Sequence, residues 1–530
     1  MPRRRQPANR ASRSSTGMPR AIRHRRRGGG RTNRGYVGAG GGRPAFLPIP
    51  LHWRGTTRQI CGLFPWGQPG ALPLVGTPIG RHQDSGGRVC FDHISWFQAG
   101  LIANPSVLIL GMPGLGKSTL TGKLATGCVA QGYTLLVPGD TKPDYPALGQ
   151  QLGCEIRTVK RSGGWALNPC DPGGMIAAAE RIGGQAGEEL RGEAIGRAVT
   201  LLAALVELCR KGPVADYEES VLGAALRQLY QQPDTVPVIA DLRALIASQP
   251  ATLWAELELE HPDGDDQAAR LAAVKEYDAL TLPLRRSLRA LIGGKYGDVF
   301  ARPTQRRPLT AGVIVDTSAI KAGNKDFLAA VLLAAWSDTY GQVEADSALA
   351  AAGHAPKRLY CMVLDEMWRV LELGGTLPER VNELTRLNRT DGVGQIMVAH
   401  SANDLKDTGS ARTDGIGERA GAIIIGGVPK KELDRLDELI TLTSAEQQAI
   451  TSWYSISREH LAEPQRDQDG RLLRPPPPGA GRFLIKTSAD QPGIPVHVVL
   501  TSIEQAWGGQ QTSRRWDRDT PTDTDTEGAA

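Results

Sequence analysis

A glycine-rich stretch, GMPGLGKST at 111–119, carries the clearest chemical signal in this sequence. It follows the apolar run SVLIL (106–110) and precedes STLTGKLATGCVAQG (118–132), which has the pattern of a helix. A loop between a strand and a helix lets backbone N–H groups surround phosphate oxygens, and the helix N-terminus adds its dipole. The spacing therefore predicts a P-loop that binds the phosphates of a nucleoside triphosphate.

Each part of this loop has an expected role. Lys117 should reach the β- and γ-phosphates, and the hydroxyl of Ser118 should bind Mg²⁺. The residues expected to contact ATP are Gly111, Met112, Pro113, Gly114, Leu115, Gly116, Lys117, Ser118 and Thr119. Asp140 is a further candidate contact, because it ends the strand-like run at 133–140; the alternative is a polar turn that caps the next helix.

A pair of acids follows another apolar run, in LYCMVLDEMW at 359–368. Asp365 suits the Mg²⁺ shell, and Glu366 suits a general base that polarises the attacking water. Two adjacent acids at this place favour a hydrolase over a kinase or a simple switch. The alternative is an exposed Asp-Glu pair at the end of a strand.

A third candidate group lies in LTRLNRTDGVGQIMVAHS at 384–401. In ring ATPases an arginine of one subunit neutralises charge on the γ-phosphate bound by its neighbour. Arg389 is the first candidate for this role and Arg386 the second, although either could form a surface ion pair. His400 follows the strand-like run and could sense the γ-phosphate, or it could simply cap the strand.

Short apolar runs alternate with helical patterns along most of the chain. Beyond the loop, strand-like runs occur at 133–140, 154–159, 311–316, 359–365, 394–399, 421–427, 482–486 and 495–500. Between the second and third of these, apolar residues recur at helical spacing over 176–305. The pattern predicts an α/β fold with a mainly parallel sheet, crossover helices and an inserted all-α subdomain.

Composition limits the class of protein. The longest apolar runs, such as VTLLAALVELC at 199–209, are shorter than the roughly 20 residues that span a bilayer, and no signal peptide is visible. The seven cysteines form no C-x-x-C pair, which favours reduced thiols over a zinc site or a disulfide framework. We therefore expect a cytoplasmic protein.

The charge is unevenly distributed. Residues 1–83 contain sixteen Arg, no Lys and no acid, which leaves 46 basic and 56 acidic side chains for the rest of the chain. Residues 1–45 have almost nothing to bury, so we expect a disordered Arg/Gly-rich arm. Its partner could be DNA phosphate or anionic lipid; the alternatives are a solvated tail or a wrongly assigned start codon.

In their order, these motifs resemble the conjugative-transfer ATPases of type IV secretion systems, within the FtsK/HerA superfamily. The stretches that carry the resemblance are GTPIGRHQDSGGRVCFD (76–92), GDTKPDYPALGQQLGCEIRTVKRSGGWALNPCD (139–171), GKYGDVFARPT (294–304), LTAGVIVDTSAI (309–320), VLDEMWRVL (363–371) and GAGRFLIKTSADQPGIPVHVVLTSIEQ (479–505). Together with the P-loop they cover about residues 72–506.

The resemblance implies a RecA-like core that hydrolyses ATP with Mg²⁺ between the subunits of a homo-hexamer. The expected organisation is a disordered arm at 1–45, a lead-in segment with short strands at 46–105, an ATPase core at 106–175 and 306–506, a helical insertion at 176–305 and a disordered tail at 507–530. The implied partners are components of a conjugation or secretion channel. Peripheral contact with the bacterial inner membrane would follow from such partners.

The sensor strand departs from the family, since it ends in Ala399-His400 where Thr-Gln is usual. Either His400 does the sensing or turnover is slow. The favoured function is a motor that powers conjugative DNA transfer or type IV secretion. The alternatives are an FtsK-like DNA translocase or coupling protein, and a slow nucleotide-gated assembly or scaffold protein.

Overall fold

The structure is a computed structural model that describes the chain in segments. These are residues 31–32, 35–36, 72–232, 236–261, 267–307, 310–321, 323–365, 392–399, 420–436, 440–454, 465–466, 472–473, 479–488 and 491–506. The chain divides into two units, Met1–Gly70 and Ala71–Ala530. In the first unit β1 (Arg31–Thr32) pairs antiparallel with β2 (Gly35–Tyr36). The predictions of a disordered arm and tail otherwise concern residues outside the described segments.

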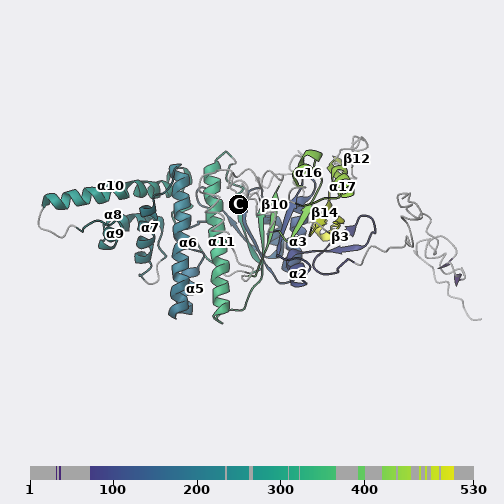
Figure 1. The fold of residues 1–530 in the computed structure, drawn as a ribbon, viewed down its shortest axis with the longest axis horizontal. Coiled ribbons are helices and arrows are strands. Elements are labelled where there is room, and N and C mark those ends of the chain that lie inside the picture. Colours follow the sequence, from purple (N-terminus) through teal and green to yellow (C-terminus); the bar gives the residue numbers. More distant parts are fainter. Residues whose placement is uncertain are drawn as a thin grey trace, which may run out of the picture. The chain divides into compact units, whose positions relative to one another are not determined.

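A mixed sheet of eleven strands forms the centre of the described part of the second unit (Figure 1). Its spatial order is β4 (Arg88–Cys90), β3 (Pro78–His82), β15 (Ile494–Val498), β14 (Arg482–Lys486), β11 (Ala422–Ile425), β5 (Ser106–Leu110), β10 (Val393–Ala399), β9 (Tyr360–Asp365), β6 (Thr134–Asp140), β8 (Gly312–Asp316) and β7 (Glu155–Thr158). The strands from β11 to β7 run parallel, and those from β14 to β4 pair antiparallel. The predicted α/β fold with a mainly parallel sheet is confirmed.

Both faces of the central parallel strands, such as β5 and β6, are buried, because helices cover each face. On β5, Val107 and Ile109 belong to the apolar cluster that includes α3, whereas Leu108 and Leu110 belong to the cluster that includes α11. Alternate residues of a strand point to opposite faces, so a strand with two buried faces is apolar throughout. This explains the uninterrupted run SVLIL.

The helices outside the insertion have these bounds: α2 (His93–Gln98), α3 (Lys117–Ala130), α4 (Pro146–Leu152), α11 (Lys325–Ala351), α16 (Lys430–Leu436), α17 (Ser444–Tyr454) and α18 (Ser502–Ala506). No helical stripe marks α11 in the sequence, and the helix was not predicted. The reason is that it is apolar and buried on nearly every side through its first five turns. A further antiparallel pair joins β12 (Gln465–Arg466) to β13 (Leu472–Leu473).

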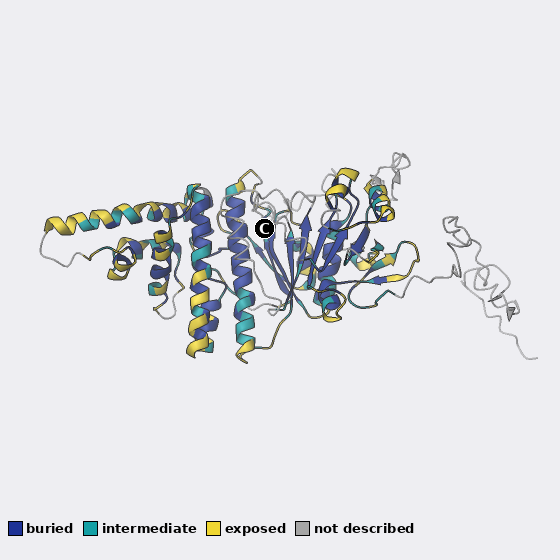
Figure 2. Cartoon of the chain, viewed as in Figure 1, coloured by how far each residue is buried: buried dark blue, intermediate teal, exposed yellow. Residues whose placement is uncertain are grey.

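Six α-helices lie between β7 and β8 in the described part of the chain. They are α5 (Met175–Ile182), α6 (Gly184–Arg210), α7 (Asp216–Leu229), α8 (Ile239–Ala247), α9 (Ala251–Glu256) and α10 (Gln267–Leu291), followed by the short 3-10 helix η1 (Gly294–Tyr296). Long α6 packs against α11, which packs against β6, and Figure 2 shows both helices buried over much of their length. The inserted helices are therefore joined to the sheet through α11. The predicted domain boundaries remain predictions.

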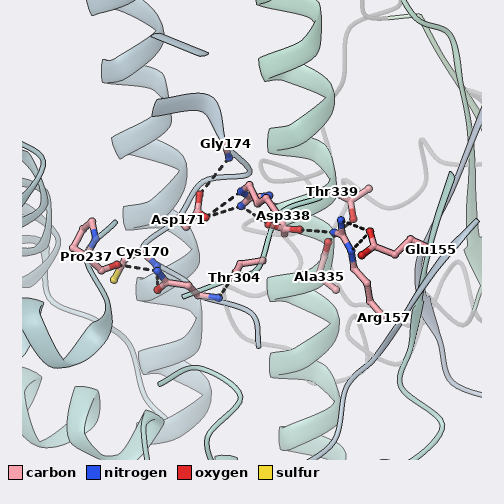
Figure 3. Close-up of polar contacts among 12 residues, drawn as sticks. Glu155, Arg157, Cys170, Asp171, Gly174, Pro237, Thr304, Ala335, Asp338 and Thr339 are labelled. Carbon is pink, nitrogen blue, oxygen red and sulfur yellow. Dashed lines mark hydrogen bonds and ion pairs between the residues drawn. The ribbon is translucent and has the colours of Figure 1, made fainter. Parts of the chain in front are cut away.

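A row of alternating charges fixes the insertion to the sheet edge. Asp338 of α11 bonds Arg306 at 2.7 Å and Arg157 of β7 at 3.5 Å. Arg306 also bonds Asp171 at 2.8 Å, and Arg157 bonds Glu155 at 2.9 Å. Figure 3 shows the row running from Asp171 through Asp338 to Arg157 and Glu155. Segments just before and just after the inserted helices thus meet on one residue of α11.

Candidate nucleotide-binding site

The predicted P-loop joins β5 to α3. Gly111, Gly114 and Gly116 have φ values of 154°, 83° and 96°, a region that side chains with a Cβ rarely adopt. A Cβ on Gly111 would lie 3.2 Å from the Cα of Gly426, so the backbone approach is also close. Backbone conformation therefore favours glycine at all three positions, and the close approach of Gly426 favours it further at Gly111.

Neighbouring strand ends support the loop from outside. The backbone N of Met112 donates to the carbonyl of Gly427 at 3.1 Å, just beyond β11. The carbonyl of Leu115 accepts from the N of Gly481 at 3.0 Å, just before β14. Sequence reasoning did not identify these two glycines, although GGVP and GAGR are visible glycine signals. Their contribution to the site is to hold the loop backbone.

The two chemically active residues of the loop begin α3. Lys117 is only 6% exposed, and its Nζ donates to the carbonyl of Gly111. The Oγ of Ser118 donates to Oδ2 of Asp144 at 3.2 Å. Both residues therefore lie in the first turn of α3, directly after the loop glycines.

Strand register brings Asp365 to the same edge of the sheet as the loop. Asp365 ends β9 and pairs with Val398 of β10, while Ala399 pairs with Leu110, the last residue of β5. Parallel strands have their carboxyl ends at one edge, where ligands of such sheets bind. Oδ2 of Asp365 accepts a hydrogen bond from the hydroxyl of Tyr145 at 3.2 Å. The two predicted Mg²⁺ ligands thus contact consecutive residues, Asp144 and Tyr145.

Asp140 organises the loop that supplies these two residues. It ends β6, is 2% exposed, and accepts hydrogen bonds from the backbone N of Lys142 at 3.0 Å and of Tyr145 at 2.9 Å. Burial raises the pKa of Asp140 to about 7, and the nearby Asp144 adds to the increase. Its observed contacts are those of a turn; the predicted contact with ATP remains a prediction.

Burial and neighbouring carboxylates also raise the pKa of Tyr145 well above its usual value, with Asp365 the foremost of those neighbours. Tyr145 therefore stays protonated and donates its hydrogen bond. From sequence alone, Asp144 and Tyr145 were recognisable only as members of a polar turn. Their contacts with Ser118 and Asp365 depend on how β6 lies beside β9 in the sheet.

Four predicted site residues lie outside the described segments: Glu366, Arg386, Arg389 and His400. Their chain positions are bounded by described strands, since Glu366 follows the last residue of β9 and His400 follows the last residue of β10. The expected roles of base, neighbour-subunit arginine and sensor remain predictions.

The residues present fit a magnesium–triphosphate group. A glycine loop with the required backbone conformation leads into a helix N-terminus, with an ammonium, a hydroxyl and a carboxylate nearby. Mg²⁺ commonly takes one or two protein oxygens and completes its shell with phosphate and water. Among the described residues no group of three or more His, Cys, Asp or Glu forms a metal site. Ser118 and Asp365 fit the Mg²⁺ pattern instead, because together they offer two protein oxygens.

Comparison with solved structures identifies the fold. VirB4 of Thermoanaerobacter pseudethanolicus matches with a TM-score of 0.56 and 16% sequence identity, over 82% of this chain and 100% of that one. This chain has the VirB4 fold. Since the identity is low, the match to VirB4 establishes the fold and no more. The resemblance to the conjugative-transfer ATPases is thus confirmed for the fold.

More distant matches include two structures of TrwB. The bacterial conjugative coupling protein TrwBdeltaN70 has a TM-score of 0.39 at 13% identity, covering 75% of this chain and 85% of that one. The plasmid coupling protein TrwB in complex with ADP and Mg²⁺ has a TM-score of 0.40 at 13% identity, covering 82% and 97%. No family model and no curated protein matches the sequence. None of the described helices is both long and apolar enough to cross a membrane.

Proposed function

We propose that this protein is an ATP-hydrolysing motor that powers conjugative DNA transfer or type IV secretion. The observation that carries the proposal is the meeting of the P-loop with Asp365 at one sheet edge, through Asp144 and Tyr145. The order of the sequence motifs and the VirB4 fold support the assignment.

Each residue of the proposed site has its own task. Lys117 binds the β- and γ-phosphates, while Ser118 and Asp365 hold Mg²⁺, which neutralises phosphate charge when bound. Glu366 takes the proton of the attacking water. Arg389, with Arg386 as second candidate, stabilises transition-state charge on the nucleotide of a neighbouring subunit.

The proposal also includes the oligomeric state, the partners and the location of the protein. A homo-hexameric ring places ATP between subunits, so that Arg389 of one subunit completes the site of the next. Channel components of the conjugation or secretion machinery are the proposed partners, at the cytoplasmic face of the bacterial inner membrane. His400 senses the γ-phosphate in place of the usual glutamine.

Hydrolysis measured against protein concentration tests the motor. We expect the rate per subunit to rise with concentration as the ring assembles, and Glu366→Gln to lower it about 100-fold or more while nucleotide still binds. Hydrolysis that is absent at every concentration would contradict the proposal.

DNA and transfer assays separate the motor from its alternatives. Strong stimulation by DNA would favour a DNA translocase or coupling protein over a secretion motor. Full conjugative transfer in cells that carry only Glu366→Gln would show that hydrolysis is dispensable, and would favour a nucleotide-gated assembly protein.

A further inference from the structure

Two consecutive residues contact the two candidate Mg²⁺ ligands. Asp144 accepts from the hydroxyl of Ser118, and the hydroxyl of Tyr145 donates to Asp365, each at 3.2 Å. Ser118 is the second residue of α3, whereas Asp365 ends β9, so the two ligands come from distant parts of the chain. One short loop therefore connects both halves of the site.

The backbone of this loop is fixed independently of those two side-chain contacts. The carboxylate of Asp140 holds the backbone N–H groups of Lys142 and Tyr145. The carbonyl of Asp140 accepts from the N and Oγ1 of Thr317, which follows β8, at 2.8 and 2.9 Å. Asp144 and Tyr145 thus lie on a turn that hydrogen bonds hold at the ends of two strands.

The hydrogen-bond chemistry suits metal binding. The hydroxyl of Ser118 donates its single hydrogen to Oδ2 of Asp144, and a hydroxyl oxygen oriented in this way can bind a cation through its lone pairs. The hydroxyl of Tyr145 donates to Oδ2 of Asp365 and so orients that carboxylate. Each contact thus holds the side chain of one candidate Mg²⁺ ligand in place.

We propose that Asp144 and Tyr145 are positioning residues for the Mg²⁺ that accompanies the nucleotide, acting through Ser118 and Asp365. The inference rests on the proposed nucleotide site. Groups that orient metal ligands change metal affinity by about 10- to 100-fold when they are removed. Asp144 is 8% exposed, so water screens its electrostatic effect on the neighbouring Ser118 only weakly.

Equilibrium binding of a fluorescent, non-hydrolysable ATP analogue tests this inference. The dissociation constant is measured in EDTA and at saturating Mg²⁺, and the ratio of the two constants reports the metal. For Asp144→Asn and Tyr145→Phe we expect this ratio to fall about 10-fold or more, with binding in EDTA nearly unchanged. A role in folding alone would not alter the ratio.

Tyr360→Phe is the matched control. Tyr360 is as buried as Tyr145 and also donates to a carboxylate, that of Asp346 at 2.6 Å, but it begins β9 at the opposite end from Asp365. We expect the wild-type ratio for this variant. If Asp144→Asn does not fold, Tyr145→Phe decides the test.

The outcomes distinguish a failure of this inference from a failure of the proposed function. A wild-type protein that binds the analogue neither with nor without Mg²⁺ would contradict the proposed function. A wild-type protein that binds better with Mg²⁺, alongside variants with the same ratio, would overturn only the roles of Asp144 and Tyr145.

Discussion

Arg306 donates to the carboxylate of Asp338 at 2.7 Å and so joins the segment after the inserted helices to the middle of α11. Burial works against the charge of Arg306, but Asp338 and Asp171 outweigh it and raise its pKa. Burial also raises the pKa of Asp171. The guanidinium of Arg306 therefore balances the negative charge of Asp171 and Asp338 where the inserted helices meet the sheet.

Replacing Arg306 should lower the stability of the protein, because the two carboxylates lose the cation that they share. Arg306→Met leaves Asp171 and Asp338 without their shared cation, and we expect the free energy of unfolding to fall by about 3 kcal/mol. Urea denaturation measures the change. Arg307→Met is the control, because Arg307 is 67% exposed and lies 3.8 Å from Glu155, so it should change stability by less than about 0.5 kcal/mol. Equal changes in the free energy of unfolding for the two variants would show that the ion pairs of Arg306 contribute nothing to stability.

Two glycine-to-alanine substitutions in helices should change the stability of the protein in opposite directions. A Cβ at Gly341 of α11 would lie 2.6 Å from the carbonyl O of Pro172, so Gly341→Ala should destabilise the protein by about 1–3 kcal/mol. Exposed Gly196 of α6 has no atom within 4 Å of such a Cβ, and Gly196→Ala should stabilise the protein by up to about 1 kcal/mol. Thermal denaturation of both variants measures the difference. Stabilisation by Gly341→Ala would contradict the close approach of α11 to this loop.

Asp140 should make stability depend on pH. Its pKa is raised to about 7 in the folded chain from a value near 4 when unfolded, so between these values the folded state holds a proton that the unfolded state has lost. Stability should therefore fall as pH rises from about 4 to about 7, by about 1.4 kcal/mol for each pH unit between the two pKa values. Asp140→Asn should flatten this part of the curve, measured by denaturation without nucleotide or metal. An unchanged slope would mean that Asp140 titrates normally.

Substitutions of two lysines of α3 should separate an effect on nucleotide binding from an effect on stability. Lys117→Met should weaken binding of an ATP analogue about 100-fold or more, because it removes the cation expected at the phosphates. Lys123→Met breaks the 2.9 Å pair with Glu504 and should lower the unfolding temperature while leaving nucleotide affinity unchanged. Fluorescent-nucleotide binding and thermal unfolding of both variants check this. A similar affinity for wild type and Lys117→Met would contradict the site.

The arginine-rich arm gives a prediction about DNA. If residues 1–45 contact phosphates, DNA affinity should fall steeply as salt rises, and deletion of 1–45 should abolish both the affinity and its salt dependence. Fluorescence anisotropy with labelled DNA at several salt concentrations measures this. Unchanged binding after the deletion would place the DNA contact elsewhere.

The sequence by itself determined the elements that carry a strong local pattern. The P-loop was predictable because glycines, Lys117 and Ser118 are adjacent in the chain, between an apolar strand and a helix. Strands such as β5 and β9 were predictable because burial on both faces makes them continuously apolar. Long α11 was not, since a helix buried on nearly every side shows no stripe.

Only the tertiary structure decided which of these residues meet. Asp365 lies at the same sheet edge as the loop because β10 lies between β9 and β5 with a fixed register, which no local pattern specifies. The contacts of Asp144 with Ser118, and of Tyr145 with Asp365, depend in the same way on β6 lying beside β9. Local residue types fixed the chemistry of the site, and the pairing of strands distant in the chain fixed its geometry.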